Sequence, residues 1–187
     1  MLAGFAGADR GQLVMACGTG KTYISVRIAE ELHCKTVLVP SISLLSQSLR
    51  VWAVQAREGI ATLAVCLDSK ADKEEGDIPV CDLGFPATTS VEQLARHGKA
   101  LKAHPPKGMM VVFSTYQSID AVGEAQQAGA FGTFDLIVCD EAHRTTGAAF
   151  EGAARSSFTK VHDNACVKRK RRLYMTAPPL RFPTVRR

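Results

Sequence analysis

The sequence predicts an α/β domain with a mainly parallel sheet, and three observations support this fold class. The chain has 187 residues, of which 46% are hydrophobic and 22% are charged, so it is long and apolar enough to form one buried core. Some apolar segments, such as Met109–Phe113, contain no polar residue. Segments with apolar residues at helical spacing lie between them. Continuous apolar strands joined by helices are typical of a parallel sheet that helices cover on both faces.

Each expected strand is a short run of apolar or β-branched residues that stops at a turn signal. Gln12–Met15 stops at a glycine-rich turn, and Thr36–Val39 stops at Pro40. In chain order, the expected strands are Gln12–Met15, Thr36–Val39, Thr62–Cys66, Met109–Phe113, Phe134–Cys139 and Leu173–Thr176.

The expected helices carry apolar residues three or four positions apart, as in Lys21–His33. Ser43 is a candidate cap for the second helix, and Ser90 with Gln93 forms a capping pattern at the third. The expected helices are Lys21–His33, Leu44–Ala53, Ser90–Lys102, part of Thr115–Gln127, and Gly147–Phe158. The segment Asp68–Pro86 is rich in Asp, Glu, Lys and Gly and has no period, so we expect an exposed loop there.

The sequence shows no signal for membrane insertion or secretion. No apolar run approaches the ~20 residues that a transmembrane helix needs, and Met1–Gln12 lacks a charged region followed by an apolar stretch. We therefore expect a cytoplasmic protein with no membrane partner. The six cysteines include no Cys-x-x-Cys pair, so buried free thiols are expected rather than a disulfide framework.

The positive charge of the chain is concentrated near its C-terminal end. The net charge is +5, and the segment from Lys160 to Arg187 holds nine Lys and Arg residues and one Asp. The run Lys168–Arg172 is entirely basic. Two interpretations are open: the run neutralises nucleic-acid phosphates, or it is a solvated loop before the last strand.

The strongest motif runs from Met15 to Thr22 and reads Met-Ala-Cys-Gly-Thr-Gly-Lys-Thr. It follows an expected strand and opens an expected helix, which is the context of a phosphate-binding loop. The glycines let the backbone N–H groups point inward at phosphate oxygens, and the helix N-terminus adds a positive field. The expected nucleotide-binding residues are Gly18, Thr19, Gly20, Lys21 and Thr22. Met15 stands where the general pattern has glycine.

Two adjacent acids, Asp140 and Glu141, follow the apolar strand Phe134–Cys139. Ligands of open α/β sheets bind at the carboxyl ends of the strands, so we expect Asp140 and Thr22 to hold Mg²⁺. Glu141 is then placed to polarise the water that attacks the γ-phosphate. ATP and Mg²⁺ are therefore the expected cofactors, and Lys21, Asp140 and Glu141 are the candidate catalytic residues.

The loop and the sequence Asp140-Glu141-Ala142-His143 together resemble the first RecA-like domain of superfamily 2 helicases and translocases of the DEAD/DEAH type. The loop variant most resembles the type III restriction-enzyme branch, in which the first loop position is commonly not glycine. The resemblance implies a three-layer RecA-like P-loop NTPase domain. It places a helicase ATP-binding domain over residues 1–179, short at its N-terminal side, and a basic tail over residues 180–187.

Three further segments are similar to motifs of that family. Leu38–Gln47 is similar to motif Ia, and Phe113–Ser118 to the segment near motif Ib. In the family these segments touch the sugar-phosphate backbone of one strand, which implies that Ser41, Thr115 and Gln117 contact nucleic acid.

The third segment, Met175–Pro179, is similar to motif III and has Pro178 where the family has threonine. The resemblance implies that Thr176 and His143 couple the nucleotide state to nucleic-acid contacts. The expected partner is nucleic acid, with DNA favoured over RNA.

The resemblance covers one of the two motor domains of the family, and the second domain supplies an arginine that speeds hydrolysis roughly a thousandfold or more. We therefore expect this chain, tested alone, to bind Mg-ATP with little turnover, the missing half coming from a second domain or subunit. Two alternatives stay open. The chain could be a different P-loop phosphotransferase, such as a small-molecule kinase, or a non-catalytic domain that binds nucleic acid or a partner.

Overall fold

The computed structural model describes residue 5 and residues 7–41, 45–66, 87–142 and 157–178. Within them, six strands form one sheet in the order β1-β6-β5-β2-β4-β3, and every strand pairing is parallel. The strands are β1 (Arg10–Val14), β2 (Thr36–Ser41), β3 (Ala61–Val65), β4 (Met110–Thr115), β5 (Phe134–Cys139) and β6 (Arg169–Thr176). The predicted α/β class with a mainly parallel sheet is confirmed.

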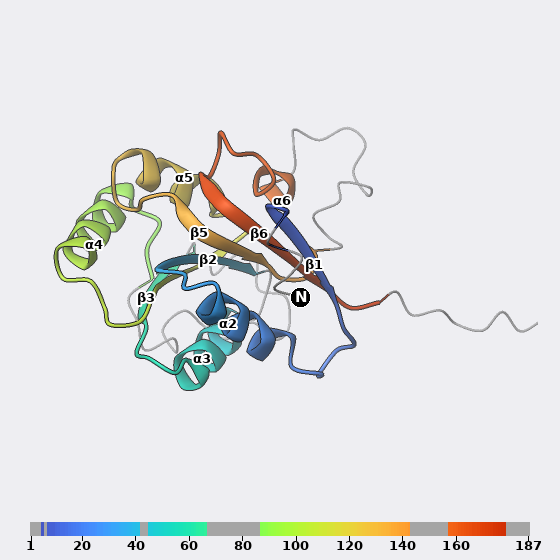
Figure 1. The fold of residues 1–187 in the computed structure, drawn as a ribbon. Helices are drawn as coiled ribbons and strands as arrows, with labels where there is room; N and C mark the ends of the chain where they lie inside the picture. The colour runs from blue at the N-terminus through green and yellow to red at the C-terminus, as the bar shows by residue number, and fades with distance from the viewer. Residues whose placement is uncertain (1–4, 6, 42–44, 67–86, 143–156, 179–187) are drawn as a thin grey trace, which may run out of the picture.

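Helices cover the two faces of the sheet and complete three layers (Figure 1). One face carries α2 (Lys21–Glu31) and α3 (Leu45–Gln55), and the other carries α4 (Val91–Ala103), α5 (Ile119–Gln127) and the short α6 (Ser157–Lys160). Each face buries its own apolar cluster. Val26, Trp52 and Phe113 belong to the first cluster, and Leu94 and Ile119 belong to the second.

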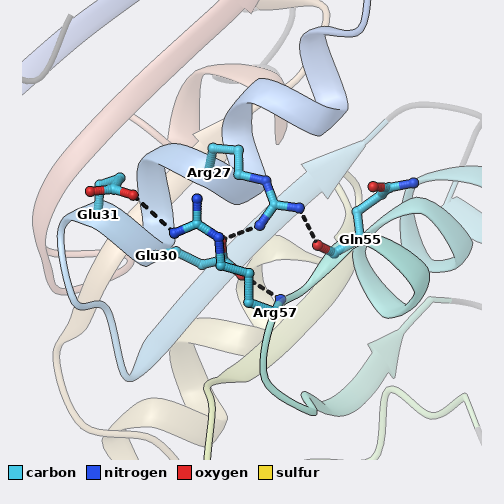
Figure 2. Close-up of polar contacts among 5 residues, drawn as sticks. All are labelled: Arg27, Glu30, Glu31, Gln55 and Arg57. Carbon is cyan, nitrogen blue, oxygen red and sulfur yellow. Dashed lines mark hydrogen bonds and ion pairs between the residues drawn. The ribbon is translucent and has the colours of Figure 1, made fainter.

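A network of arginines and acids holds α2 against the end of α3 (Figure 2). The guanidinium of Arg27 donates to Glu30 at 2.5 Å and to the carbonyl oxygen of Gln55 at 2.6 Å. The backbone N–H of Arg57 donates to the other Glu30 oxygen at 2.7 Å, and its guanidinium donates to Glu31 at 3.0 Å. These contacts fix the C-terminal part of α2, whose N-terminus directly follows the loop after β1.

The structure confirms one predicted helix cap and corrects the last strand. The hydroxyl of Ser90 accepts a hydrogen bond from the backbone N–H of Gln93 at 3.3 Å. Strand β6 begins at Arg169 rather than at Leu173, so the solvated-loop interpretation is wrong for residues 169–172. The strand extends there because it pairs with both β1 and β5 and because acids elsewhere neutralise two of its charges. Arg169 pairs with Asp9 at 2.7 Å, and Lys170 pairs with Asp135 at 2.7 Å.

Several expectations fall outside the described residues. They concern the Ser43 cap, the loop at 68–86, most of the helix at 147–158, His143 and the tail at 180–187. No helix among the described residues is long and apolar enough to cross a membrane.

The carboxyl ends of all six strands meet at one edge of the sheet because every pairing is parallel. Strand β6 lies between β1 and β5, and strands in a sheet are about 4.8 Å apart. The ends of β1 and β5 are therefore separated by about 10 Å. The loop after β1 and the acids after β5 thus lie on the same edge of the sheet.

Candidate functional site

The loop between β1 and α2 forms a turn in which side chains of the loop donate hydrogen bonds to its own carbonyl groups. Gly18 and Gly20 have φ values of 74° and 90°, in the left-handed region that glycine adopts without strain. The hydroxyl of Thr19 donates to the carbonyl oxygen of Ala16 at 2.6 Å, which closes the turn. Gly20 caps α2 without a side-chain hydrogen bond, and the first turn of this helix holds no acid. The N–H groups at the start of α2 are therefore available to an anion.

Lys21 is the first residue of α2 and is partly buried. Its ammonium donates to the carbonyl oxygens of Met15 at 3.3 Å and Ala16 at 3.4 Å. It forms no ion pair within the described part of the chain. A phosphate oxygen forms a stronger, charge-assisted bond than a carbonyl oxygen does, so a bound phosphate would replace these contacts.

Asp140 follows β5 directly and is held at its backbone. Its N–H donates to the carbonyl oxygen of Pro40 at 3.4 Å, and its own carbonyl accepts from the hydroxyl of Tyr116 at 2.7 Å. One carboxylate oxygen accepts from the N–H of Glu141 at 2.9 Å. Glu141 has a φ of 48°, which is unusual for a residue with a side chain.

The charges that act on Asp140 include the ammonium of Lys21, which lies in the loop Met15–Thr22. Burial is the main influence on the pKa of Asp140 and raises it, and the neighbouring Glu141 carboxylate raises it further. The N–H of Glu141 and the ammonium of Lys21 act in the opposite direction and lower this pKa, but the net shift is upward. A carboxylate that is buried without full compensation is stabilised by a nearby cation, and Mg²⁺ is such a cation.

Thr176 lies at the end of β6, between the loop and the acids. Its carbonyl oxygen accepts from the N–H of Met15 at 3.1 Å, so the start of the loop is tied to the end of β6. The Thr176 hydroxyl donates to the carbonyl oxygen of Ala177 at 3.2 Å. The structure therefore brings the predicted coupling residue Thr176 to the same edge as Lys21 and Asp140.

The residues predicted to contact nucleic acid lie further along that edge, at the ends of two paired strands. Ser41 of β2 is in register with Thr115 of β4. Ser41 is buried, Thr115 is half-buried and its hydroxyl donates to Ser118 at 3.0 Å, and Gln117 is exposed. Gln117 is thus the most accessible of the three.

Sequence reasoning assigned no role to Tyr116, which the structure places against Asp140. Tyr116 is fully buried, and its sequence context resembles that of any core aromatic residue after a strand. Its hydrogen bond to Asp140 joins residues 24 positions apart, so no local pattern could have revealed it.

Comparisons with known proteins concern the family and the fold of this chain. A family model described as "Type III restriction enzyme, res subunit" matches residues 2–181. The chain is 45% identical to the ATP-dependent Type ISP restriction-modification enzyme LlaBIII in a DNA-bound structure, with a TM-score of 0.80, and the match covers 95% of this chain and 12% of that chain. It is 42% identical to a nuclease-deletion mutant of the Type ISP enzyme LlaGI, solved with a DNA substrate mimic, with a TM-score of 0.76 and coverage of 97% and 17%.

A third match concerns the fold alone. The Hef helicase domain of Pyrococcus furiosus is 20% identical, with a TM-score of 0.54 and coverage of 97% of this chain and 33% of that chain. A search of curated proteins gives no match.

The chain spans less than a fifth of the length of the two Type ISP chains that it resembles. Because the family model covers almost the whole sequence, the chain belongs to the family of type III restriction enzyme res subunits, and it has a RecA-like α/β fold.

Proposed function

We propose that this chain is the ATP-binding motor domain of a DNA helicase or translocase, in which hydrolysis of Mg-ATP is coupled to movement along DNA. One observation carries the proposal. The loop Met15–Thr22 and the acids Asp140 and Glu141 lie on one edge of the sheet with only β6 between them. Lys21 is close enough to Asp140 to lower its pKa.

Each site residue has a chemical role in this proposal. Gly18, Thr19 and Gly20 wrap the outer phosphates with their backbone N–H groups, and Lys21 binds them through its ammonium. The hydroxyl of Thr22 and the carboxylate of Asp140 are the hard oxygen ligands that Mg²⁺ prefers. Mg²⁺ held by these two residues would neutralise charge on the phosphate oxygens.

The remaining acid, Glu141, acts on the attacking water. The Glu141 carboxylate orients that water and accepts its proton. We expect slow turnover when this polypeptide is tested alone. The family resemblance assigns an additional arginine to the second motor domain, and that charge stabilises the transition state.

The proposed nucleic-acid surface is the strand-end region of Ser41, Thr115 and Gln117, with Gln117 as the exposed member. DNA is favoured over RNA because the LlaGI and LlaBIII structures contain DNA or a DNA mimic. The basic run at the start of β6 is a weaker candidate, because Arg169 and Lys170 already pair with acids of this chain.

A titration with a fluorescent ATP analogue tests the proposal. We expect the wild-type chain to bind the analogue with Mg²⁺, and Lys21→Ala to weaken binding about 100-fold, because two charge-assisted bonds to phosphate are lost. Lys35→Ala is the matched control: this exposed lysine precedes β2 at the opposite edge and should leave the affinity unchanged.

Single-stranded DNA, added to the same titration, separates the alternatives. A motor domain should change its nucleotide affinity when DNA is present, whereas a small-molecule kinase should be indifferent to DNA. Equal binding of the analogue by wild type and Lys21→Ala would contradict the nucleotide site itself and favour the non-catalytic alternative.

A further inference from the structure

We propose that Tyr116 is a positioning residue of this site: its hydroxyl fixes the peptide group between Asp140 and Glu141 and thereby links the end of β4 to the magnesium-binding acid. The inference rests on the proposed function, since it assumes that these acids serve Mg-ATP. It assigns to Tyr116 the task of coupling the strand-end region near Thr115 and Gln117 to magnesium binding.

The peptide group between the two acids is hydrogen-bonded at both of its polar atoms. Its carbonyl, which belongs to Asp140, accepts from the Tyr116 hydroxyl at 2.7 Å. Its N–H, which belongs to Glu141, donates to a carboxylate oxygen of Asp140 at 2.9 Å. The orientation of this peptide plane therefore determines where the Asp140 carboxylate is held and the direction in which the Glu141 side chain leaves the backbone.

The backbone at Glu141 requires such support. Its φ of 48° lies in the left-handed region, which disfavours a residue with a Cβ atom. Conformations of this kind persist where surrounding contacts hold them, and they concentrate at functional sites. Rotation of the peptide plane would relax Glu141 and move both carboxylates. The Tyr116 hydroxyl opposes that rotation.

Tyr116 is itself anchored firmly enough to act as a support. Its side chain is fully buried in the apolar cluster between α5 and the sheet. Its backbone carbonyl accepts from the N–H of Ile119, at the start of α5, at 3.3 Å. A buried tyrosine hydroxyl is uncharged at neutral pH, so it donates its hydrogen to the Asp140 carbonyl.

The position of Tyr116 in the chain supplies the link to nucleic acid. It lies between Thr115, whose hydroxyl contacts Ser118, and Gln117, which is exposed. A DNA strand that contacts Gln117 acts on the same short segment that carries the Tyr116 ring. A shift of this segment would be transmitted through the hydroxyl to the peptide between Asp140 and Glu141.

The test is Tyr116→Phe, which removes the hydroxyl and keeps the ring. Tyr174→Phe is the matched control, since Tyr174 packs against the same cluster and its hydroxyl bonds to His162 Nδ1 at 3.0 Å. The readout is the Mg²⁺ concentration that gives half-maximal binding of the fluorescent ATP analogue, together with the Mg²⁺-free affinity and the melting temperature.

We expect Tyr116→Phe to raise the half-saturating Mg²⁺ concentration about tenfold, as expected when a buried carbonyl loses its hydrogen bond. It should leave the Mg²⁺-free affinity unchanged and abolish the effect of single-stranded DNA on nucleotide binding. Tyr174→Phe should keep the wild-type Mg²⁺ dependence and DNA effect, whatever its effect on melting temperature. As a second measurement on the unmutated sequence, the ¹⁹F resonance of fluorotyrosine at Tyr116 should shift when Mg²⁺ joins the nucleotide, and that at Tyr174 should not.

The outcomes separate this inference from the proposed function. Unchanged Mg²⁺ dependence in Tyr116→Phe, or an equal change in both tyrosine variants, overturns the role of Tyr116 and leaves the nucleotide site intact. A ¹⁹F resonance of Tyr116 that ignores Mg²⁺ overturns it as well. Failure of the wild-type chain to bind the analogue overturns both proposals.

Discussion

The two edges of the sheet use the same kinds of charged side chains in opposite ways. At the amino edge, Asp135 accepts hydrogen bonds from the N–H groups of Lys35 and Thr36 at 2.8 and 3.0 Å and from the ammonium of Lys170 at 2.7 Å. At the carboxyl edge, the Lys21 ammonium donates to carbonyl oxygens, and Asp140 is partly buried and has a raised pKa.

The difference distinguishes charges with a structural role from charges of the candidate site. Asp135 joins the starts of β2, β5 and β6, and its partners stabilise its charge, so its pKa is lowered although burial acts in the opposite direction. The charge on Asp140 is less well compensated by the protein, and a bound cation would supply the rest. Charges satisfied within the chain hold the sheet together, and charges left for a ligand define the candidate site.

The largest effect expected from this comparison is a contrast between two Asp→Asn variants. Asp140→Asn should weaken Mg²⁺-dependent binding of the ATP analogue tenfold or more, since the metal loses a charged ligand, by the order of about 1.4 kcal/mol or more. Asp135→Asn should leave nucleotide binding unchanged and lower the free energy of unfolding by about 1–2 kcal/mol. Fluorescence titration and urea denaturation measure the two quantities.

The same pair should also differ in the sign of the stability change. Because the folded protein raises the pKa of Asp140, its ionised form destabilises the fold at neutral pH, and a neutral Asn should increase the free energy of unfolding. The comparison between the edges is wrong if Asp140→Asn destabilises the chain as much as Asp135→Asn does.

A smaller effect is expected at Arg172, in the middle of β6. Arg172 is fully buried. Its Nη1 donates to Asn164 at 3.0 Å, while Nε and Nη2 have no hydrogen-bond partner within the described structure. Burial also lowers its pKa. We expect Arg172→Met to raise the free energy of unfolding by about 1 kcal/mol, because replacing an incompletely paired buried charge with an apolar side chain often stabilises a protein. A clear loss of stability in urea denaturation would show that the charge of Arg172 is used.

The pH dependence of stability gives a third prediction. The folded-state pKa of Asp135 lies below its ordinary value of 3.8, so its contribution is present above that pH and is lost as the pH falls through the lower folded value. Wild type should therefore lose stability relative to Asp135→Asn as the pH falls below about 4. A constant difference between the two proteins across this range would contradict the assignment.

The smallest effect should come from the basic run. Lys168 and Lys170 lie at the amino edge, and Lys170 is paired with Asp135. The double variant Lys168→Ala/Lys170→Ala should change the slope of log affinity for DNA against log salt by less than about 1. If the slope falls by about 2, both lysines contact phosphates, and the nucleic-acid surface extends to the amino edge.

Much of this structure could be predicted because its signals are local. Glycines at positions 18 and 20 predict a turn, and in the structure both have the positive φ values that this turn requires. The β5 boundaries Phe134–Cys139 match the apolar run, and the Ser90 cap follows from residues three apart.

The missed features depend on residues far apart in the chain. The basic run 169–172 looks solvated in the sequence, because the acids that pair with it, Asp9 and Asp135, are distant in the chain and approach it only in the folded structure. The contact between Tyr116 and Asp140 likewise appears only when β4 and β5 are placed in the sheet. Ser41 is buried in the folded chain, and its polar residue type alone could not show this.

The central claim is that one Mg-triphosphate site spans the loop after β1 and the acid after β5. A crystal structure with a non-hydrolysable ATP analogue and Mn²⁺ in place of Mg²⁺ tests it directly, because anomalous scattering locates the metal. The metal should lie between the Thr22 hydroxyl and the Asp140 carboxylate, with the phosphates inside the Met15–Thr22 loop. A metal bound away from both residues, or phosphates outside that loop, would contradict the claim.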